Sequence, residues 1–129
     1  MLFSEGEKEF LLEHRICRLA TVSAGGQPHN VPVGYAFDGK RFYVTTDYGT
    51  RKLKNLRQNR RMALLVDIPK KPRRAVMVQG SADLLESGAE FEEAAGFVAE
   101  QRGWRRWREG EQVVLKITPA KKSSWGLEG

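Results

Sequence analysis

The feature that most constrains the fold of this chain is a series of short segments rich in β-forming residues, each bounded by turn-forming residues. Six such segments occur, at residues 16–22, 29–37, 41–46, 62–67, 75–85 and 111–118. Asp38-Gly39-Lys40 gives the strongest hairpin signal, because glycine supplies the positive φ that a tight reversal needs. Pro119 is expected to end the last strand. Consecutive hairpins form an antiparallel sheet, which removes its exposed edges best by curling into a barrel.

Three further segments have the composition of short helices. Ser4-Glu5-Gly6-Glu7 has the pattern of a capping box, and the helix that it begins should run to about His14. Thr50 is a good N-cap for a second helix, which should end near Asn59. A third helix is expected over residues 89–102, whose apolar side is formed by Phe91, Ala94, Ala95 and Val98. We therefore predict a mainly β protein, an antiparallel barrel of about six strands with two or three short helices.

Length and composition describe one globular domain. The chain has 129 residues, enough for one core and too few for two, so we treat residues 1–129 as a single domain. Apolar residues make up 40% and charged residues 29%, the balance of a water-soluble protein. No apolar run approaches the roughly 20 residues that span a bilayer, and residues 1–8 are acidic where a secretory signal would be basic. A cytoplasmic location without a membrane partner is expected.

The residues that most often form disulfides and metal sites are scarce. Cys17 is the one cysteine of the sequence, so it cannot form an intrachain disulfide, and its surroundings indicate a buried structural thiol. His14 and His29 are the two histidines, and they are interpreted as surface or hydrogen-bonding residues. No metal site is predicted.

The positive charge of the chain is concentrated in one stretch. The net charge of +6 and the pI near 9.7 favour anions, which include nucleic acid, an acidic lipid surface and a phosphorylated small molecule. Between residues 51 and 61 there are six cations and no acid: Arg51, Lys52, Lys54, Arg57, Arg60 and Arg61. The sequence therefore predicts a local cationic field.

This field begins in a segment that suits a phosphate group. Residues 45–52, Thr-Thr-Asp-Tyr-Gly-Thr-Arg-Lys, place hydroxyls, a glycine and two cations around the predicted start of a helix. The unpaired amides and the dipole of a helix N-terminus favour an anion, and the cations add charge-assisted hydrogen bonds. The alternative is that Thr50 only caps the helix while the cations face water, and this segment alone leaves both interpretations open.

Three motifs follow one another along most of the chain. The first joins residues 18–22 to 26–33, the second joins 42–46 to 49–56, and the third is 76–82. In order and spacing they resemble the opening hairpin, the phosphate-binding strand, turn and helix, and the next long strand of the pyridoxamine 5'-phosphate oxidase-related proteins. The resemblance to this FMN-binding split-barrel superfamily implies a split antiparallel β-barrel.

The resemblance also implies the positions of a flavin site. The edge of the isoalloxazine ring would be lined by Asn30, Val31, Pro32 and Val33. The ribityl phosphate would be held by Thr45, Thr46, Thr50, Arg51 and Lys52. Because the family's site usually lies between subunits, a homodimer is implied, and Trp125 of the partner subunit would complete the pocket. The alternative for this tryptophan is that it covers the barrel.

The sequence departs from true pyridoxamine phosphate oxidases. Asn30 and Tyr35 stand where those enzymes have an arginine and a lysine, so vitamin B6 oxidation is not expected. The chain is more similar to short relatives that bind FMN or the deazaflavin coenzyme F420. We take FMN as the first choice, in an oxidoreductase that transfers hydride between the flavin and a small molecule, with no catalytic residue assigned. An F420-dependent reductase is the alternative, and its polyglutamate tail would suit Arg73, Arg74, Arg105, Arg106 and Arg108.

Two other classes of function remain open. Trp104-Arg105-Arg106-Trp107-Arg108 interleaves aromatic and cationic residues, as single-stranded nucleic-acid binders do. We prefer the interpretation that the two tryptophans pack a helix end against the barrel while the arginines face water. The third class is a flavin carrier or sensor that has the cofactor pocket and no turnover.

Overall fold

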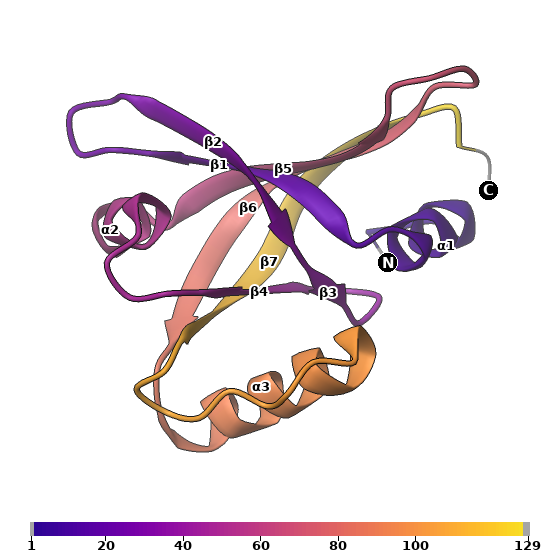
Figure 1. Cartoon of the computed structure of the whole chain (residues 1–129). Coiled ribbons are helices and arrows are strands. Elements are labelled where there is room, and N and C mark those ends of the chain that lie inside the picture. Colours follow the sequence, from indigo (N-terminus) through magenta and orange to yellow (C-terminus); the bar gives the residue numbers. More distant parts are fainter. Residues whose placement is uncertain (1, 128–129) are drawn as a thin grey trace.

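The chain forms one curled antiparallel sheet with three helices around it (Figure 1). The structure is a computed structural model that describes residues 2–127. Within them the elements are α1 (Glu5–Glu13), β1 (Ile16–Val22), β2 (Pro28–Gly34), β3 (Ala36–Phe37), β4 (Phe42–Thr46), α2 (Arg51–Gln58), β5 (Arg61–Ile68), β6 (Arg74–Leu85), α3 (Gly88–Arg102) and β7 (Val113–Trp125). The strand order is β2-β1-β5-β6-β7-β4-β3, and each neighbouring pair is antiparallel. The predicted mainly β split barrel is confirmed. Among the described residues, no helix has the length and apolar character needed to cross a bilayer.

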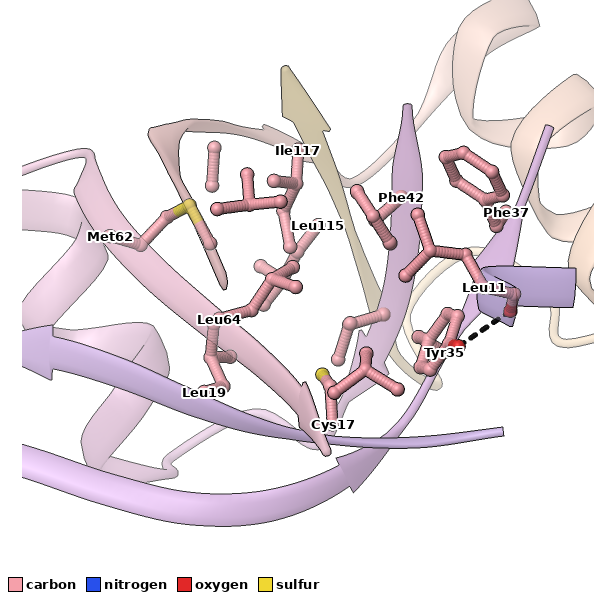
Figure 2. Close-up of a cluster of buried hydrophobic side chains, with 14 of the residues drawn as sticks. Leu11, Cys17, Leu19, Tyr35, Phe37, Phe42, Met62, Leu64, Leu115 and Ile117 are labelled. Atoms are coloured by element: carbon pink, nitrogen blue, oxygen red, sulfur yellow. Dashed lines mark hydrogen bonds between the residues drawn. The ribbon is translucent and has the colours of Figure 1, made fainter. Parts of the chain in front are cut away.

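The two edge strands of the sheet are joined through Tyr35. β2 lies at one edge and β3 at the other, although only Tyr35 separates them in the chain. The tyrosine is buried, and its hydroxyl donates to the carbonyl oxygen of Leu11 at 2.6 Å (Figure 2). Because so short a link connects both edges, the sheet has to curl until the edges approach each other. The single strand predicted over residues 29–37 is therefore two strands.

The core fills the inside of the curl. Along β1, Cys17 and Leu19 are buried while Ile16 and Arg18 are exposed, the alternation of a strand with one face inward. Figure 2 shows these inward side chains in one cluster with Leu64 of β5, the strand paired with β1, and with Leu115 of β7. Full burial of such a side chain stabilises the fold by about 1.5–3 kcal/mol. The buried structural role predicted for the cysteine is confirmed, and burial raises the pKa of its thiol to about 12.

The last strand is longer than the sequence predicts. β7 runs through Pro119 to Trp125, and its second half pairs with the first half of β6. The expectation that the proline ends the strand is wrong, because Pro119 lies opposite Gly80 at a shift in register, where a bulge tolerates a residue without an N–H. A Cβ on Gly80 would overlap the carbonyl oxygen of Thr118, so only glycine permits this close approach.

A buried ion pair fastens α1 to this second half of β7. The predicted capping box is present: Ser4 Oγ accepts from the Glu7 N–H at 3.1 Å, and the Glu7 carboxylate accepts from the Ser4 N–H at 2.8 Å. Lys122 Nζ lies 2.8 Å from both carboxylate oxygens, and Ser124 Oγ donates to one of them at 2.6 Å. Burial by itself would raise the pKa of Glu7, but these partners together lower it to about 2.

This lowered pKa predicts a loss of stability in acid. The free energy that Glu7 contributes is fully present above its ordinary pKa of 4.5 and disappears as the pH falls toward about 2. Glu7→Gln keeps the capping box and removes the charge, so we expect it to lower the free energy of unfolding at pH 7 by about 1–3 kcal/mol. The difference from the unmodified protein should shrink at pH 3. Urea unfolding at both pH values measures this.

Glu5→Gln is the matched control, because Glu5 lies in the same helical turn with its side chain 83% exposed. The control should change stability by less than about 0.5 kcal/mol at either pH. Equal losses in the two variants would contradict the assignment.

Candidate functional site

The first turn of α2 lacks a side-chain cap. Thr46 ends β4 and is buried, Gly49 turns the chain with a φ of 85°, and Thr50 occupies the N-cap position with extended backbone. The Thr50 hydroxyl is used elsewhere: it donates to the carbonyl oxygen of Asp47 at 3.2 Å and lies 2.9 Å from the Thr46 hydroxyl. The predicted N-cap position is therefore right and the predicted capping bond is wrong. The first amides of the helix point outward without a side-chain partner, where an anion can reach them.

Two cations beside these amides are also without acidic partners. Within residues 2–127, neither Arg51 nor Lys52 lies within 4 Å of a carboxylate. Further along the same cationic stretch, Arg57 pairs with Glu86 at 3.1 Å and Arg60 pairs with an aspartate at 3.2 Å. Arg51 and Lys52 thus place uncompensated charge at the N-terminal end of α2, where the helix dipole also favours an anion.

A buried asparagine holds α2 in place. Asn55 is 2% exposed, and its Nδ2 donates to the Thr21 hydroxyl of β1 at 3.0 Å. Sequence analysis included this residue in the second motif but gave it no role in the site, although a polar residue between Leu53 and Leu56 on the apolar side of the helix is a signal. The bond fixes the distance between the start of the helix and the β1–β2 hairpin.

Between α2 and that hairpin lies a hollow of about 300 Å³, lined by Ser23, Gln27, Pro28, His29, Arg51 and Asn55. His29 Nδ1 is buried there and has no hydrogen-bond partner among the described residues. Sequence analysis gave His29 no role in the site. The Arg51 guanidinium lines the same hollow, and an anionic ligand there would supply the acceptor that this cation lacks among the described residues.

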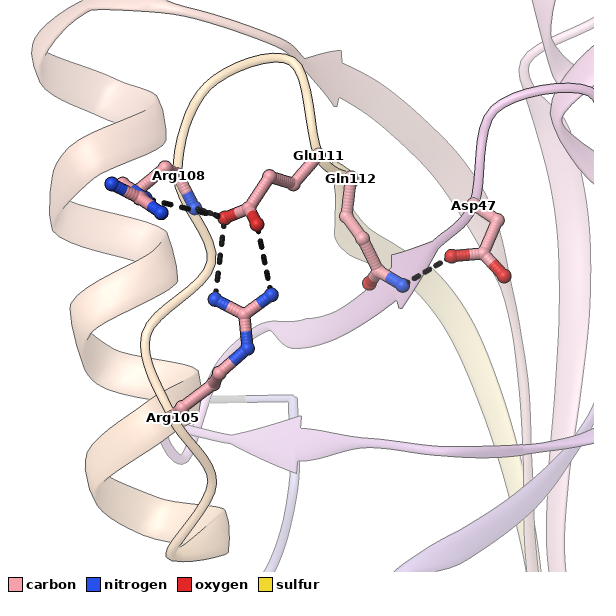
Figure 3. Close-up of polar contacts among 5 residues, drawn as sticks. All are labelled: Asp47, Arg105, Arg108, Glu111 and Gln112. Carbon is pink, nitrogen blue, oxygen red and sulfur yellow. Dashed lines mark hydrogen bonds and ion pairs between the residues drawn. The ribbon is translucent and has the colours of Figure 1, made fainter.

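On its other side, the turn before α2 is braced by the loop that precedes β7 (Figure 3). Gln112 Nε2 donates to the Asp47 carboxylate, so this acid is directed away from the cations of α2. Glu111 accepts from the Arg105 guanidinium at 2.8 Å and from the Arg108 N–H at 2.7 Å, and these bonds hold the pKa of Glu111 at about 2. The loop is thereby kept rigid against the turn.

The structure brings together most of the segments that the resemblance assigned to a cofactor. β2 begins beside the hollow at Pro28 and continues through residues 30–33, where Asn30 and Pro32 are exposed and the two valines are half-buried. It is an edge strand, so one side of its backbone is unpaired within the sheet. Residues 45–52 lie at the near end of this strand. The phosphate segment and β2 therefore form one continuous surface.

Trp125 is not part of that surface in the same chain. Thr46 pairs with Val113 at the start of β7, whereas Trp125 is the last residue of that strand and pairs with Ala75. Trp125 is 52% exposed.

The three arginines after α3 form exposed ion pairs with two glutamates of the same subunit. Arg105 pairs with Glu111 at 2.8 Å, Arg106 pairs with Glu92 at 3.3 Å, and Arg108 lies 3.7 Å from Glu111. All three arginine side chains are more than half exposed, so their suitability for a polyanionic tail stays a prediction.

Comparison with known proteins agrees with this geometry. Residues 3–126 match the protein family described as pyridoxamine 5'-phosphate oxidase. The chain is 34% identical, over its whole length and 87% of the relative, to a 5a,11a-dehydrotetracycline/5a,11a-dehydrooxytetracycline reductase from Streptomyces rimosus. A conserved hypothetical protein from Mycobacterium tuberculosis superimposes with a TM-score of 0.80 at 25% identity, over 97% of this chain and 86% of that one.

A solved structure titled F420 reductase superimposes with a TM-score of 0.75 over 94% of this chain and 98% of that one. Its 22% identity shows a common fold. The match of nearly the whole chain to one family model, together with the 34% identical reductase, establishes the family. The chain belongs to the pyridoxamine 5'-phosphate oxidase family.

Proposed function

We propose that this chain is a flavin-dependent reductase that holds the phosphate of FMN at the N-terminus of α2. The observation that carries the proposal is the uncapped first turn of α2 beside Arg51 and Lys52, which have no acidic partner within residues 2–127. Membership of the family and the 34% identical reductase support an oxidoreductase.

The residues present fit a phosphate monoester. Such a group carries a charge of about −1.5 to −2 and strong acceptor oxygens. The first amides of α2 and the two cations are donors that need acceptors of this kind. The hydroxyls of Thr46 and Thr50 lie at the same turn. Among the described residues, no side chain caps the first turn of α2 and no carboxylate pairs with the two cations.

The flavin ring would extend from this phosphate along β2, beside residues 30–33. When bound, the flavin supplies the hydride chemistry itself, so the protein needs to orient the ring and exclude water rather than provide an acid or base. The unpaired backbone of this edge strand offers amide and carbonyl groups to polar atoms of the ring. The side chains of Val31 and Val33 are half-buried and keep that strand fixed to the core.

The substrate that we propose is a small conjugated molecule whose double bond accepts the hydride, as the name of the Streptomyces reductase indicates for that relative. Coenzyme F420 is the second candidate for the cofactor, because it also carries a ribityl phosphate, and a neighbour of the same fold is titled F420 reductase.

We further propose that the protein is a homodimer formed by the outer face of the sheet. Outward-facing positions of neighbouring strands carry apolar residues that this chain leaves uncovered or half-covered: Ile16, Ala20, Ala63, Leu65, Met77 and Trp125. Uncovered apolar surface of this kind is typical of an interface between subunits. A second copy would bring its Trp125 to a cofactor pocket from which the chain's own Trp125 is remote.

The phosphate assignment predicts the effect of removing each cation. Arg51→Ala and Lys52→Ala should each weaken FMN binding by about 1.5–3 kcal/mol, the range for a charged hydrogen bond, which is about a tenfold to hundredfold increase in Kd. Flavin fluorescence titration measures the Kd, and circular dichroism shows whether the fold is kept.

Lys54→Ala is the matched control, since it removes the same charge from an exposed position of the same helix. It should change the Kd less than about threefold. If the three variants bind FMN alike, the phosphate lies elsewhere.

The dimer proposal predicts that a charge on the outer face separates the subunits. Ala63 lies between two inward residues of β5 and faces outward. Ala63→Arg should convert the dimer to a monomer in light scattering after gel filtration, and FMN affinity should fall with it. Ala89→Arg, on the exposed surface of α3, should leave the dimer intact. A monomeric unmodified protein would refute the proposal.

Turnover distinguishes the proposed enzyme from its alternatives. With FMN and a reduced nicotinamide, or with reduced F420, the protein should reduce 5a,11a-dehydrotetracycline, followed by absorbance and by the mass gain of two hydrogens. Tight, saturable cofactor binding without reduction of any conjugated substrate would indicate a carrier or sensor. Binding of neither cofactor, with oligonucleotide affinity that falls steeply with salt, would favour the nucleic-acid alternative.

A further inference from the structure

The C-terminal end of α3 is anchored to β3, directly after the far end of β2. Gln101 of α3 bonds both backbone groups of Phe37, accepting at 2.7 Å and donating at 2.8 Å. Gly103 then reverses the chain with a φ of 71°, and the Trp104 N–H donates to the carbonyl oxygen of Ala99 at 3.1 Å. The backbone on either side of Arg102 is therefore fixed relative to the sheet.

Trp104 lies directly against Gly34, the last residue of β2. A Cβ on Gly34 would lie 3.2 Å from Cη2 of the indole and 3.1 Å from an Arg102 terminal nitrogen, so the missing side chain makes room for both. Alternate residues of a strand share one face, and this places Gly34 on the same face as the exposed Asn30 and Pro32. The indole thus stands at the end of the surface along which we place the flavin ring.

The guanidinium of Arg102 supports the indole and has no counter-ion. It lies 4.6 Å from the ring centroid, and its Nη1 donates to the carbonyl oxygens of Arg15 at 2.7 Å and Tyr35 at 3.1 Å. No carboxylate of residues 2–127 lies within 4 Å of it. Burial, and then the nearby Arg15, lower the pKa of Arg102. An anion brought close to this cation would therefore be favoured.

Trp107, the second tryptophan after α3, also lies against an arginine and serves as a comparison for Trp104. Trp107 is half-buried, and the guanidinium above it, that of Arg105, is neutralised by Glu111 at 2.8 Å. Trp104 differs in both respects: it is 42% exposed, and its arginine has no acid. A rigid, exposed indole on a fixed cation is suited to stacking with a planar ligand. The side chains are already ordered in the free protein, so binding loses little conformational entropy.

We propose that Trp104 and Arg102 form the substrate subsite of the reductase, in which the indole stacks against a planar conjugated ring system and the guanidinium attracts an anionic oxygen on it. The inference rests on the proposed function and identifies the class of substrate. Cofactor binding remains the task of residues 30–33 and 45–52, so the two assignments can be tested separately.

The test compares Trp104→Leu, which keeps apolar bulk, with Trp104→Phe, which keeps an aromatic face. With the cofactor-loaded protein and 5a,11a-dehydrotetracycline as the planar probe, Trp104→Leu should raise KM by about tenfold, and Trp104→Phe should recover most of the loss. The KM for 2-cyclohexen-1-one, a small monocyclic enone, and the Kd of the cofactor should change less than about twofold.

Gly34→Ala is an independent variant, because it keeps the indole and displaces it. Gly34 has no positive φ, so alanine fits its backbone, and its methyl group would press on Trp104. It should raise KM for the planar probe in the same selective way. Trp107→Leu is the control, the same change three positions along, and should leave both KM values as they are.

The outcomes separate this inference from the function on which it rests. If the probe is reduced with the same KM by the unmodified protein and Trp104→Leu, or if cofactor affinity falls as much as probe affinity, the subsite is wrong and the reductase stands. If nothing is reduced, calorimetric binding of the probe to the loaded protein decides. Affinity lost in Trp104→Leu and recovered in Trp104→Phe supports the subsite alone, and a probe that does not bind the unmodified protein overturns it.

Discussion

The close approach of β6 and β7 at Gly80 is the constraint on which the rest of the structure depends. Because a glycine there admits the Thr118 carbonyl, β7 continues past Pro119 and pairs along β6 on both sides of the irregularity. Its first half binds β4 and so fixes Thr46 at the start of the phosphate turn. Its second half carries Lys122, which fastens α1. One long strand thus connects the candidate site at one end of the sheet to the N-terminal helix.

The candidate site arises from competition for hydrogen bonds. A threonine at an N-cap normally satisfies an amide of the first turn, but here the Thr50 hydroxyl is engaged by Asp47 and Thr46. The Asp47 carboxylate is in turn held by Gln112. The result is a helix start whose donors are left for a ligand, next to two cations that, within residues 2–127, lack acidic partners. Such a site costs stability in the free protein, and a bound phosphate offsets that cost.

Charge is distributed unevenly between the site and the rest of the surface. The arginines that follow α3 are paired with Glu92 and Glu111, so the high net charge does not make the whole surface attractive to polyanions. Arg102 and the first cations of α2, in contrast, have no acidic partner within residues 2–127. The proposed phosphate site lies at one end of β2, and Trp104 with Arg102 lies at the other. This arrangement suits a cofactor bound along the strand with a planar substrate at its far end.

The sequence by itself determined the elements whose signals are local. The capping box at Ser4, the glycine turn after Phe37 and the alternating strands follow from neighbouring residues, and the family followed from the order of three motifs. Strand order, the break at Tyr35 and the continuation through Pro119 depend on partners that are distant in the sequence, which no local pattern encodes. The same holds for the site: residue types predicted a phosphate at residues 45–52, but which cations keep their charge, and that Asn55 and His29 adjoin them, was decided by the tertiary structure, because pairing and burial are set by what the fold brings into contact.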